Sequence, residues 1–346
     1  MVLRDECCRA GAAGPWYKNK TSIVALVLFF FVCLSYILSF LEPFREALFM
    51  YISIVWWAML LGLFLGGVIE HFVPEQYITQ VLARKRRRTI LHAVGLGFFS
   101  SACSCGVLAL AIQLHKKGAA TASIIAFLLA SPWANLPLTI ILAGFFGLIK
   151  TLYIVFAAIT IALSTGFIFQ FLEKKNFIER NLSTVAYDKD FSIVNDIRER
   201  LRGYRLTKDR VVRDMKGVFN GAAALADMVL WWILIGMGLA AFISAYVPEN
   251  IFQDYMGPSL SGLSVTLVVA TILEVCSEGT APLAFEIFRQ TGALGNALVF
   301  LMAGVATDYT EIGLLWTNVG RKTAIWLPVI AVPQVILFGW LANILF

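Results

Sequence analysis

Nine long apolar segments are the feature that most limits what this 346-residue chain can form. They cover about residues 21–41, 48–70, 90–114, 119–148, 150–172, 218–246, 262–288, 293–316 and 323–346. A hydrocarbon core of roughly 30 Å needs about 20 apolar residues per helix. Only 14% of the residues are charged, against about 25% in soluble globular chains. The pattern predicts an all-α polytopic membrane protein and excludes a soluble enzyme and a disordered chain.

Two of these segments are interrupted at their centres by small, polar and helix-breaking residues. The third contains the run SSACSCG at 100–106, and the seventh contains EVCSEGTAP at 274–282. Irregular backbone at membrane depth is tolerated only inside protein or beside a water-filled cavity. We therefore expect each interrupted segment to form two half-length helices joined by a tip, as a re-entrant hairpin that returns to its own side.

The distribution of basic residues predicts the orientation. Seven spans plus two hairpins place 25 of the 28 Lys and Arg residues on the cytoplasmic side and leave Arg45, Lys150 and Arg289 outside. Nine crossings would place 12 inside and 16 outside, although without the polar stretch 173–217 the two ratios are 13 to 3 and 12 to 4. Basic residues favour the cytoplasmic side. We predict that the N-terminus and 173–217 are cytoplasmic and that the C-terminus is external. The net charge of +6 then reports sidedness and does not indicate a nucleic-acid partner.

An internal repeat relates the two halves with an offset of 173 to 175 residues. The matching groups are Trp56-Trp57 with Trp231-Trp232, Val73-Pro74-Glu75 with Val247-Pro248-Glu249, Cys103-Ser104 with Cys276-Ser277, Gly106 with Gly279, Gly118-Ala119 with Gly292-Ala293, and Phe127-Leu128 with Phe300-Leu301. Each repeat contains three spans and one hairpin, and an odd number of crossings gives the repeats opposite orientation. Inverted repeats with broken helices are a recurrent transporter design with the substrate site near the midplane.

The repeat divides the chain into four regions. We predict an N-terminal arm and first transmembrane helix at 1–47, a first transport repeat at 48–172, a cytoplasmic linker at 173–217 and a second transport repeat at 218–346.

The motifs at the interruptions resemble those of the predicted-permease family that includes the ArsP-like organoarsenical efflux permeases. They are Cys103-Ser104-Cys105-Gly106, Lys117-Gly118-Ala119, Ser131-Pro132-x-x-Asn135, Cys276-Ser277-Glu278-Gly279 and Gly304-Val305-Ala306-Thr307-Asp308. The resemblance covers roughly residues 48–346 and implies a membrane permease, with efflux as the expected direction. The second half departs from the first, because Glu278 and Asp308 stand where the first half has Cys105 and Asn135.

Three of the six cysteines lie in the interrupted segments. Thiolate ligands select soft metals and metalloids, so Cys103, Cys105 and Cys276 are candidate substrate contacts. The neighbouring Ser104 and Ser277, with Asn135 in the fourth segment, complete the candidate substrate site. The alternative is that each cysteine is a small buried apolar residue.

Four acidic residues lie inside otherwise apolar segments: Glu274, Glu278, Asp308 and Glu311. A charge at the bilayer centre costs at least about 2.5–3.5 kcal/mol on insertion scales, so such residues usually serve function. We assign them to proton or cation coupling, with a structural hydrogen bond to a hairpin backbone as the alternative.

Five small or helix-breaking residues are expected to shape the site. Gly106, Gly279 and Pro282 belong to the hairpins, while Pro132 and Pro137 interrupt the fourth segment. Proline removes a helical hydrogen bond and kinks a span. Two interpretations of the fourth segment stay open: a packing kink, or an unwound stretch that lines the substrate path beside Asn135.

The sequence therefore favours a secondary-type permease for a small solute, either a thiophilic metalloid or soft metal species, a hard cation, or a sulfur-containing metabolite. The competing class is a membrane-embedded thiol oxidoreductase that uses the Cys-x-Cys pair. We find no Walker or dinucleotide-binding motif, no histidine pair at ligand spacing and no cofactor signature. Membrane lipid is an expected partner, and a homo-oligomer stays open. The basic run 84–88 is interpreted as a solvated cytoplasmic anchor, with binding of anionic lipid as the alternative.

Overall fold

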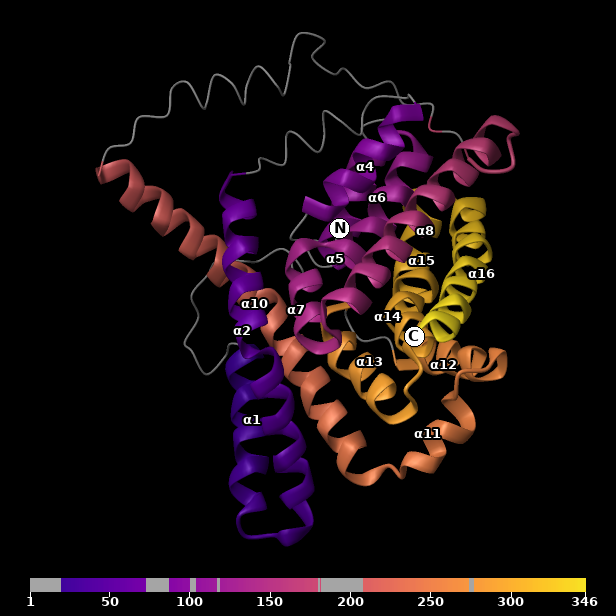
Figure 1. Cartoon of the computed structure of the whole chain (residues 1–346). Coiled ribbons are helices and arrows are strands. Elements are labelled where there is room, and N and C mark those ends of the chain that lie inside the picture. The colour runs from indigo at the N-terminus through magenta and orange to yellow at the C-terminus, as the bar shows by residue number, and fades with distance from the viewer. Residues whose placement is uncertain are drawn as a thin grey trace.

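The computed structural model describes residues 20–72, 87–99, 104–116, 119–179, 181, 208–273 and 277–346. Within these ranges the regular elements are all helices (Figure 1). They are α1 (Lys20–Ser35), the 3-10 helix η2 (Ser39–Leu41), α2 (Glu42–Phe72), α4 (Arg87–Phe99), α5 (Ser104–Lys116), α6 (Thr121–Ala134), α7 (Leu136–Phe146), α8 (Leu148–Lys174), α10 (Lys208–Tyr246), α11 (Glu249–Met256), α12 (Leu260–Leu273), α13 (Ser277–Thr291), α14 (Leu294–Thr307), α15 (Tyr309–Asn318) and α16 (Arg321–Leu345).

Five stretches of the described chain are long and apolar enough to cross a membrane. They are Ser39–Leu65, Thr121–Phe146, Leu148–Lys174, Leu294–Asn318 and Arg321–Leu345. A sixth is formed if Leu230–Tyr246 and Asn250–Met256, which are bent by 110° at Pro248, count as one span. The prediction of a multi-pass helical membrane protein is thereby confirmed. The first predicted span, 21–41, forms only the 16-residue apolar helix α1.

The core of the molecule is built around α6 and α14. Every residue of α6 is buried, as are nearly all residues of α14. Helices α4, α5 and α8 pack on α6, while α12, α13 and α16 pack on α14, and α6 and α14 also contact each other. Figure 1 shows α4 and α5 toward one end of the molecule and α11 to α13 toward the other. The outer helices present exposed apolar side chains such as Trp56, Phe156 and Trp340.

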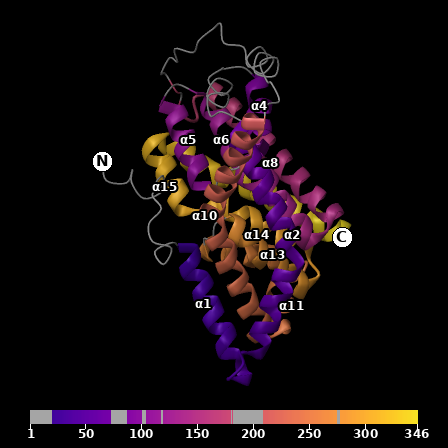
Figure 2. The same cartoon turned by 90° about the vertical axis from the view of Figure 1, so that its left-hand side faces the viewer.

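The long helices α2 and α10 pack against each other along one side of this core (Figure 2). Their contact depends on close backbone approach, because a Cβ atom at Gly67 of α2 would lie 2.5 Å from the carbonyl oxygen of Val218. Near the end of α2, His71 lies 3.3 Å from Asp214 of α10. Small residues at helix contacts are typical of membrane proteins, where dispersion and close packing hold helices together.

Both interrupted segments consist of two short helices. The third segment forms α4 and α5, which flank residues 100–103, and the seventh forms α12 and α13, which flank residues 274–276. The predicted tips themselves lie outside the described residues, and the re-entrant path stays a prediction. The turn after α13 explains one repeated motif, because Gly292 has φ +67°, a conformation that favours glycine.

The segment that follows α8 ties the two halves together. Glu179 accepts hydrogen bonds from the backbone N–H groups of Lys322 (2.9 Å) and Thr323 (3.1 Å) at the start of α16, and from the Thr323 hydroxyl (3.2 Å). The Asn181 amide donates to the carbonyl oxygens of His115 and Ala119, between α5 and α6. A carboxylate at a helix N-terminus satisfies free N–H groups and complements the helix dipole.

We predict that Glu179 stabilises the protein above mildly acidic pH. Burial raises the pKa of Glu179, but the hydrogen bonds from Lys322 and Thr323 outweigh it and place the pKa below that of a free glutamate. This stabilisation is complete above the unfolded pKa and is lost as the pH falls through the folded pKa. Glu179→Gln should cost about 1 kcal/mol at neutral pH, and thermal unfolding should show the difference from wild type shrinking below about pH 4.3. A pH-independent difference would contradict the assignment.

Candidate functional site

The fourth apolar segment is interrupted at a single residue. Asn135 has extended dihedral angles (φ −67°, ψ 151°) between α6 and α7. Its side-chain oxygen accepts a hydrogen bond from the N–H of Leu138 at 2.7 Å, and its carbonyl oxygen accepts one from the N–H of Thr139 at 2.9 Å. Pro137 lies in the first turn of α7, where its missing N–H leaves nothing unsatisfied. The interruption is therefore a capped helix break, and α6 and α7 still continue as one apolar span.

The second half contains a matching break at Asp308, between α14 and α15. The Asp308 carboxylate accepts a hydrogen bond from the N–H of Glu311 at 3.0 Å, and the Asp308 carbonyl accepts one from the N–H of Ile312 at 2.9 Å. The two caps thus have the same i to i+3 geometry on an amide and on a carboxylate. Glu311 is 2% exposed, so its carboxyl group is inside the protein beside the break.

Each break lies beside the helix end that precedes a predicted tip of the same half. A Cβ atom at Gly97, near the end of α4, would lie 2.8 Å from the Cβ of Ala130 and 3.1 Å from the backbone nitrogen of Ser131 on α6. Thr271, near the end of α12, forms a 2.8 Å hydrogen bond with Thr307 on α14. In the first half α4 thus meets α6 through close packing at Gly97, and in the second half α12 meets α14 through a hydrogen bond between two hydroxyl groups.

The halves also contact one another around these breaks. α7 packs on α13, and α5 packs on α15. A small hollow between the two halves is lined by residues of α6, α7, α8 and α14: Pro132, Trp133, Leu138, Leu142, Ile154, Leu301 and Met302. Among the described residues, the Ser131 hydroxyl and the Trp133 indole N–H are buried without a hydrogen-bond partner. The region near the first break therefore contains polar groups that are free to meet a solute or water.

Several predicted site residues cannot be placed in this arrangement. Cys103, Glu274 and Cys276 lie outside the described residues. Five others belong to the first turns of α5 and α13, but the structure does not describe side chains there: Ser104, Cys105, Gly106, Ser277 and Glu278. Among the described residues, no three His, Cys, Asp or Glu side chains could hold a metal ion.

Of the remaining predicted residues, Asn135, Asp308, Glu311, Pro132 and Pro137 gather at the two breaks, and Gly279 and Pro282 lie buried on α13. A Cβ atom at Gly236 of α10 would lie 2.1 Å from the Gly279 carbonyl oxygen. Gly279 thus lies where the backbones of α13 and α10 approach each other closely.

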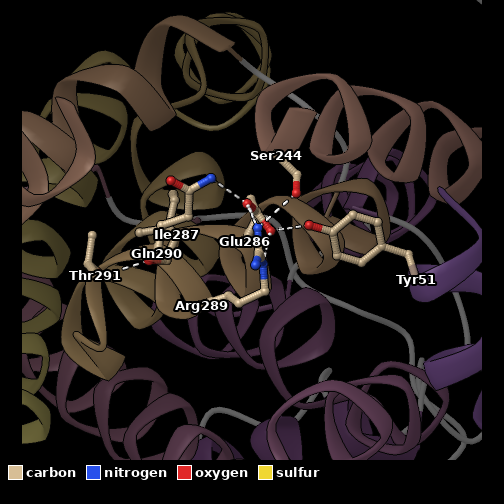
Figure 3. Close-up of polar contacts among 7 residues, drawn as sticks. All are labelled: Tyr51, Ser244, Glu286, Ile287, Arg289, Gln290 and Thr291. Carbon is tan, nitrogen blue, oxygen red and sulfur yellow. Dashed lines mark hydrogen bonds and ion pairs between the residues drawn. The ribbon is translucent and has the colours of Figure 1, made fainter. Parts of the chain in front are cut away.

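A buried charge network on α13 was not predicted from the sequence. The Glu286 carboxylate is 1% exposed and accepts hydrogen bonds from Tyr51 of α2, from Gln290 (2.5 Å) and from Nε and Nη2 of Arg289 (2.8 and 2.7 Å). Arg289 also donates to the Ser244 hydroxyl of α10 at 2.8 Å. Figure 3 shows Tyr51 of α2 and Arg289 of α13 at the Glu286 carboxylate, with Ser244 of α10 bonded to Arg289.

A sequence signal for this network did exist. Glu286 lies at the end of the seventh apolar segment and Arg289 directly follows that segment, three residues later, a spacing at which residues are neighbours on a helix. Arg289 was interpreted only as an external loop residue, which left Glu286 without an assigned partner.

Comparisons with known proteins agree with this architecture. A family model described as "Predicted permease" matches residues 44–344. The chain is 23% identical over 282 residues to UPF0718 protein YcgR of Bacillus subtilis, covering 81% of this chain and 90% of the relative. It is 22% identical to a "Putative two-component membrane permease complex subunit" of Streptococcus mutans (74% and 80% covered) and 29% identical to "Putative permease Rv2963" of Mycobacterium tuberculosis (67% and 59%). No solved structure matches.

We predict that the side-chain oxygen at residue 135 is required to stabilise the first break. Asn135→Leu removes the acceptor for the Leu138 N–H and should lower the free energy of unfolding by about 1 kcal/mol or more. Asn135→Ser keeps a neutral side-chain oxygen at the cap and should unfold nearer the wild-type temperature in detergent. Equal melting temperatures for wild type and the Leu variant would show that the cap contributes nothing.

Proposed function

The chain belongs to the predicted-permease family, and on that basis we propose that it is a secondary-type permease. It moves a small solute through a central site between its two halves. The observation that carries the proposal is the pair of matching helix breaks at Asn135 and Asp308, each beside a helix that leads into an interrupted segment. Broken helices supply backbone groups and helix ends to the substrate sites of secondary transporters.

In this proposal the two halves are inverted repeats and the two tips, 100–103 and 274–276, meet at the solute. The cross-packing of α7 on α13 and of α5 on α15 supports it, because each hairpin arm then contacts the short helix after the break of the other half. The tips contribute Cys103, Cys105 and Cys276 as contacts for a thiophilic metalloid or soft metal species. A hard cation or a sulfur-containing metabolite would instead use the hydroxyl and carboxyl groups.

A flux panel in proteoliposomes tests the proposal directly. It compares a trivalent organoarsenical, a soft metal ion, a hard cation and a small thiol compound, each with and without a pH gradient. Gradient-dependent flux of any one of them supports a secondary permease, and the direction of that flux tests the expected efflux. Thiol–disulfide exchange without flux would favour the membrane-embedded oxidoreductase. Co-purification of a second copy or of another membrane subunit would test the association suggested by the name of the Streptococcus mutans relative.

We predict that the linker near Tyr187 and the loop near Lys116 face the cytoplasm, whereas Asp254 faces outside. The reason is the excess of basic residues in the linker and in the loop near Lys116, because basic residues favour the cytoplasmic side. Single cysteines introduced at these positions should react with an impermeant reagent added outside whole cells only at residue 254. External labelling at residue 116 would exclude the hairpin arrangement.

We predict separate roles for the acid and the thiols of the two tips. A carboxyl group in a desolvated site can carry a proton near neutral pH, so Glu278→Gln should abolish the pH dependence of flux and leave solute binding intact. Replacing Cys103 and Cys105 together with serine should weaken binding of a thiophilic solute by about tenfold or more, which corresponds to about 1.4 kcal/mol.

The matched control for the thiol variant is Cys33→Ser, because Cys33 is an exposed cysteine on α1. If Glu278→Gln keeps the wild-type pH profile, coupling belongs to Glu274, Asp308 or Glu311. If the double serine variant binds and moves its solute normally, Cys103 and Cys105 are packing residues, and a hard ion or a polar metabolite is favoured over a metalloid.

A further inference from the structure

Helix α13 is attached to α10 at two points. Near its start, Gly279 approaches Gly236 so closely that a Cβ atom on Gly236 would lie 2.1 Å from the Gly279 carbonyl oxygen. Near its end, Arg289 donates to Ser244. Both residue numbers increase from the first contact to the second, so α10 and α13 run parallel. Ala240 is midway between Gly236 and Ser244 at i+4 spacing, on the same face of α10, and it is fully buried.

The two attachments differ in kind. The contact at Gly279 is a close packing of small residues, whereas the contact at Arg289 depends on a buried charge. Glu286 and Tyr51 are almost completely buried, and the carboxylate is bound by Arg289, Gln290 and the Tyr51 hydroxyl (Figure 3). A buried carboxylate that loses its charged partner is strongly destabilised. The network therefore fixes the end of α13 to both α2 and α10.

The geometry also allows this attachment to open. The Arg289 side chain is 41% exposed, whereas Glu286 is 1% exposed, so the guanidinium end of the pair lies at the protein surface. Tyr51 and Gln290 are neutral donors that can stay with Glu286. Pro282 lies between the two attachment points inside α13, where proline weakens the helix and permits bending. The face of α10 between them carries glycine, alanine and serine, which separate without interlocked side chains.

The first half has no equivalent ion pair. With the 173-residue offset of Gly106 and Gly279, Gln113 and Lys116 of α5 stand in the sequence where the second half has Glu286 and Arg289. The end of α5 is instead held by Asn181, which donates to the His115 carbonyl. The ends of the two helices are thus held by different contacts. The end of α13 is held through its own Arg289, and the end of α5 is held by Asn181 in the segment after α8.

We propose that Arg289, held in place by Glu286 and bonded to Ser244, forms a releasable latch between α13 and α10, with Tyr51 holding Glu286 from α2. Its opening exposes the face of α10 that leads toward the start of α13. Glu286 and Tyr51 are positioning residues in this scheme, since they act through α13. The role as a gate for solute rests on the proposed permease function. The opening of the α10–α13 contact does not rest on the proposed permease function, because it can be measured without any solute.

The test uses Ala240→Cys as a reporter in the full-length protein in lipid nanodiscs. A maleimide is added, and the modified residue is identified by mass spectrometry of peptides, which separates residue 240 from the native cysteines. Labelling should be slow in the reporter alone and about tenfold faster with Glu286→Gln, because local opening exposes buried groups without global unfolding. Tyr51→Phe keeps the ion pair and should give a smaller increase.

The matched control is Glu42→Gln, which removes an exposed glutamate–arginine pair with the same i, i+3 spacing, Glu42 with Arg45. It should leave labelling at residue 240 unchanged. A second reporter, Ala126→Cys in the buried helix α6, should stay unlabelled in every variant. An unchanged rate in Glu286→Gln would overturn the latch. Equal acceleration at residues 126 and 240 would also overturn it, since the ion pair would then support only the global fold.

Discussion

The need to satisfy backbone hydrogen bonds where a helix is broken inside a membrane protein governs the centre of this fold. Water is scarce there, so an unpaired N–H group is costly. The chain meets this constraint with side chains placed one residue before a new helix: the amide of Asn135 caps α7 and the carboxylate of Asp308 caps α15. Each cap satisfies a backbone N–H group that the break would otherwise leave unpaired, which lowers the free-energy cost of the break. Polar groups can therefore lie in the core of an otherwise apolar molecule.

Close helix packing around the breaks follows from a second constraint. In lipid, helices gain little from burying apolar surface and associate through close contacts of small residues. Gly97 meets α6, Gly62 of α2 meets Pro137, and Gly236 of α10 meets Gly279. These contacts bring the long helix pair α2 and α10, the hairpin arms and the broken spans within a few ångströms of one another. Aromatic contacts such as Phe145 with Phe285, 5.1 Å apart, fill the space between α7 and α13.

The two halves are alike in helix order and unlike in polar chemistry. The first break carries an amide and lies near the buried donors of Ser131 and Trp133, while the second carries the carboxylate of Asp308 with Glu311 beside it. A symmetric arrangement of helices can therefore present donors from one side and acceptors from the other.

The sequence predicted the breaks correctly where a polar or helix-breaking residue lies inside an apolar helical segment. Asn135, Pro137 and Asp308 are unusual inside apolar runs, and each lies at a break in the structure. Sequence reasoning missed Glu286, although the three-residue spacing to Arg289 was a local signal. The contact of that carboxylate with Tyr51, 235 residues away, has no local pattern. Residues 100–103 and 274–276 were predicted as tips, and they lie outside the described residues.

The sequence by itself determined the helical membrane class, the places where the helices are interrupted and the family, because hydrophobic length, helix breakers and short motifs are local properties. Only the tertiary structure decided which helices surround α6 and α14, that Glu179 caps α16 from across the molecule, and that the charge on α13 is matched by Arg289, Tyr51 and Gln290. Those pairings depend on the path of the chain between distant segments, and the free energy of a buried charge is set by the groups that this path brings to it.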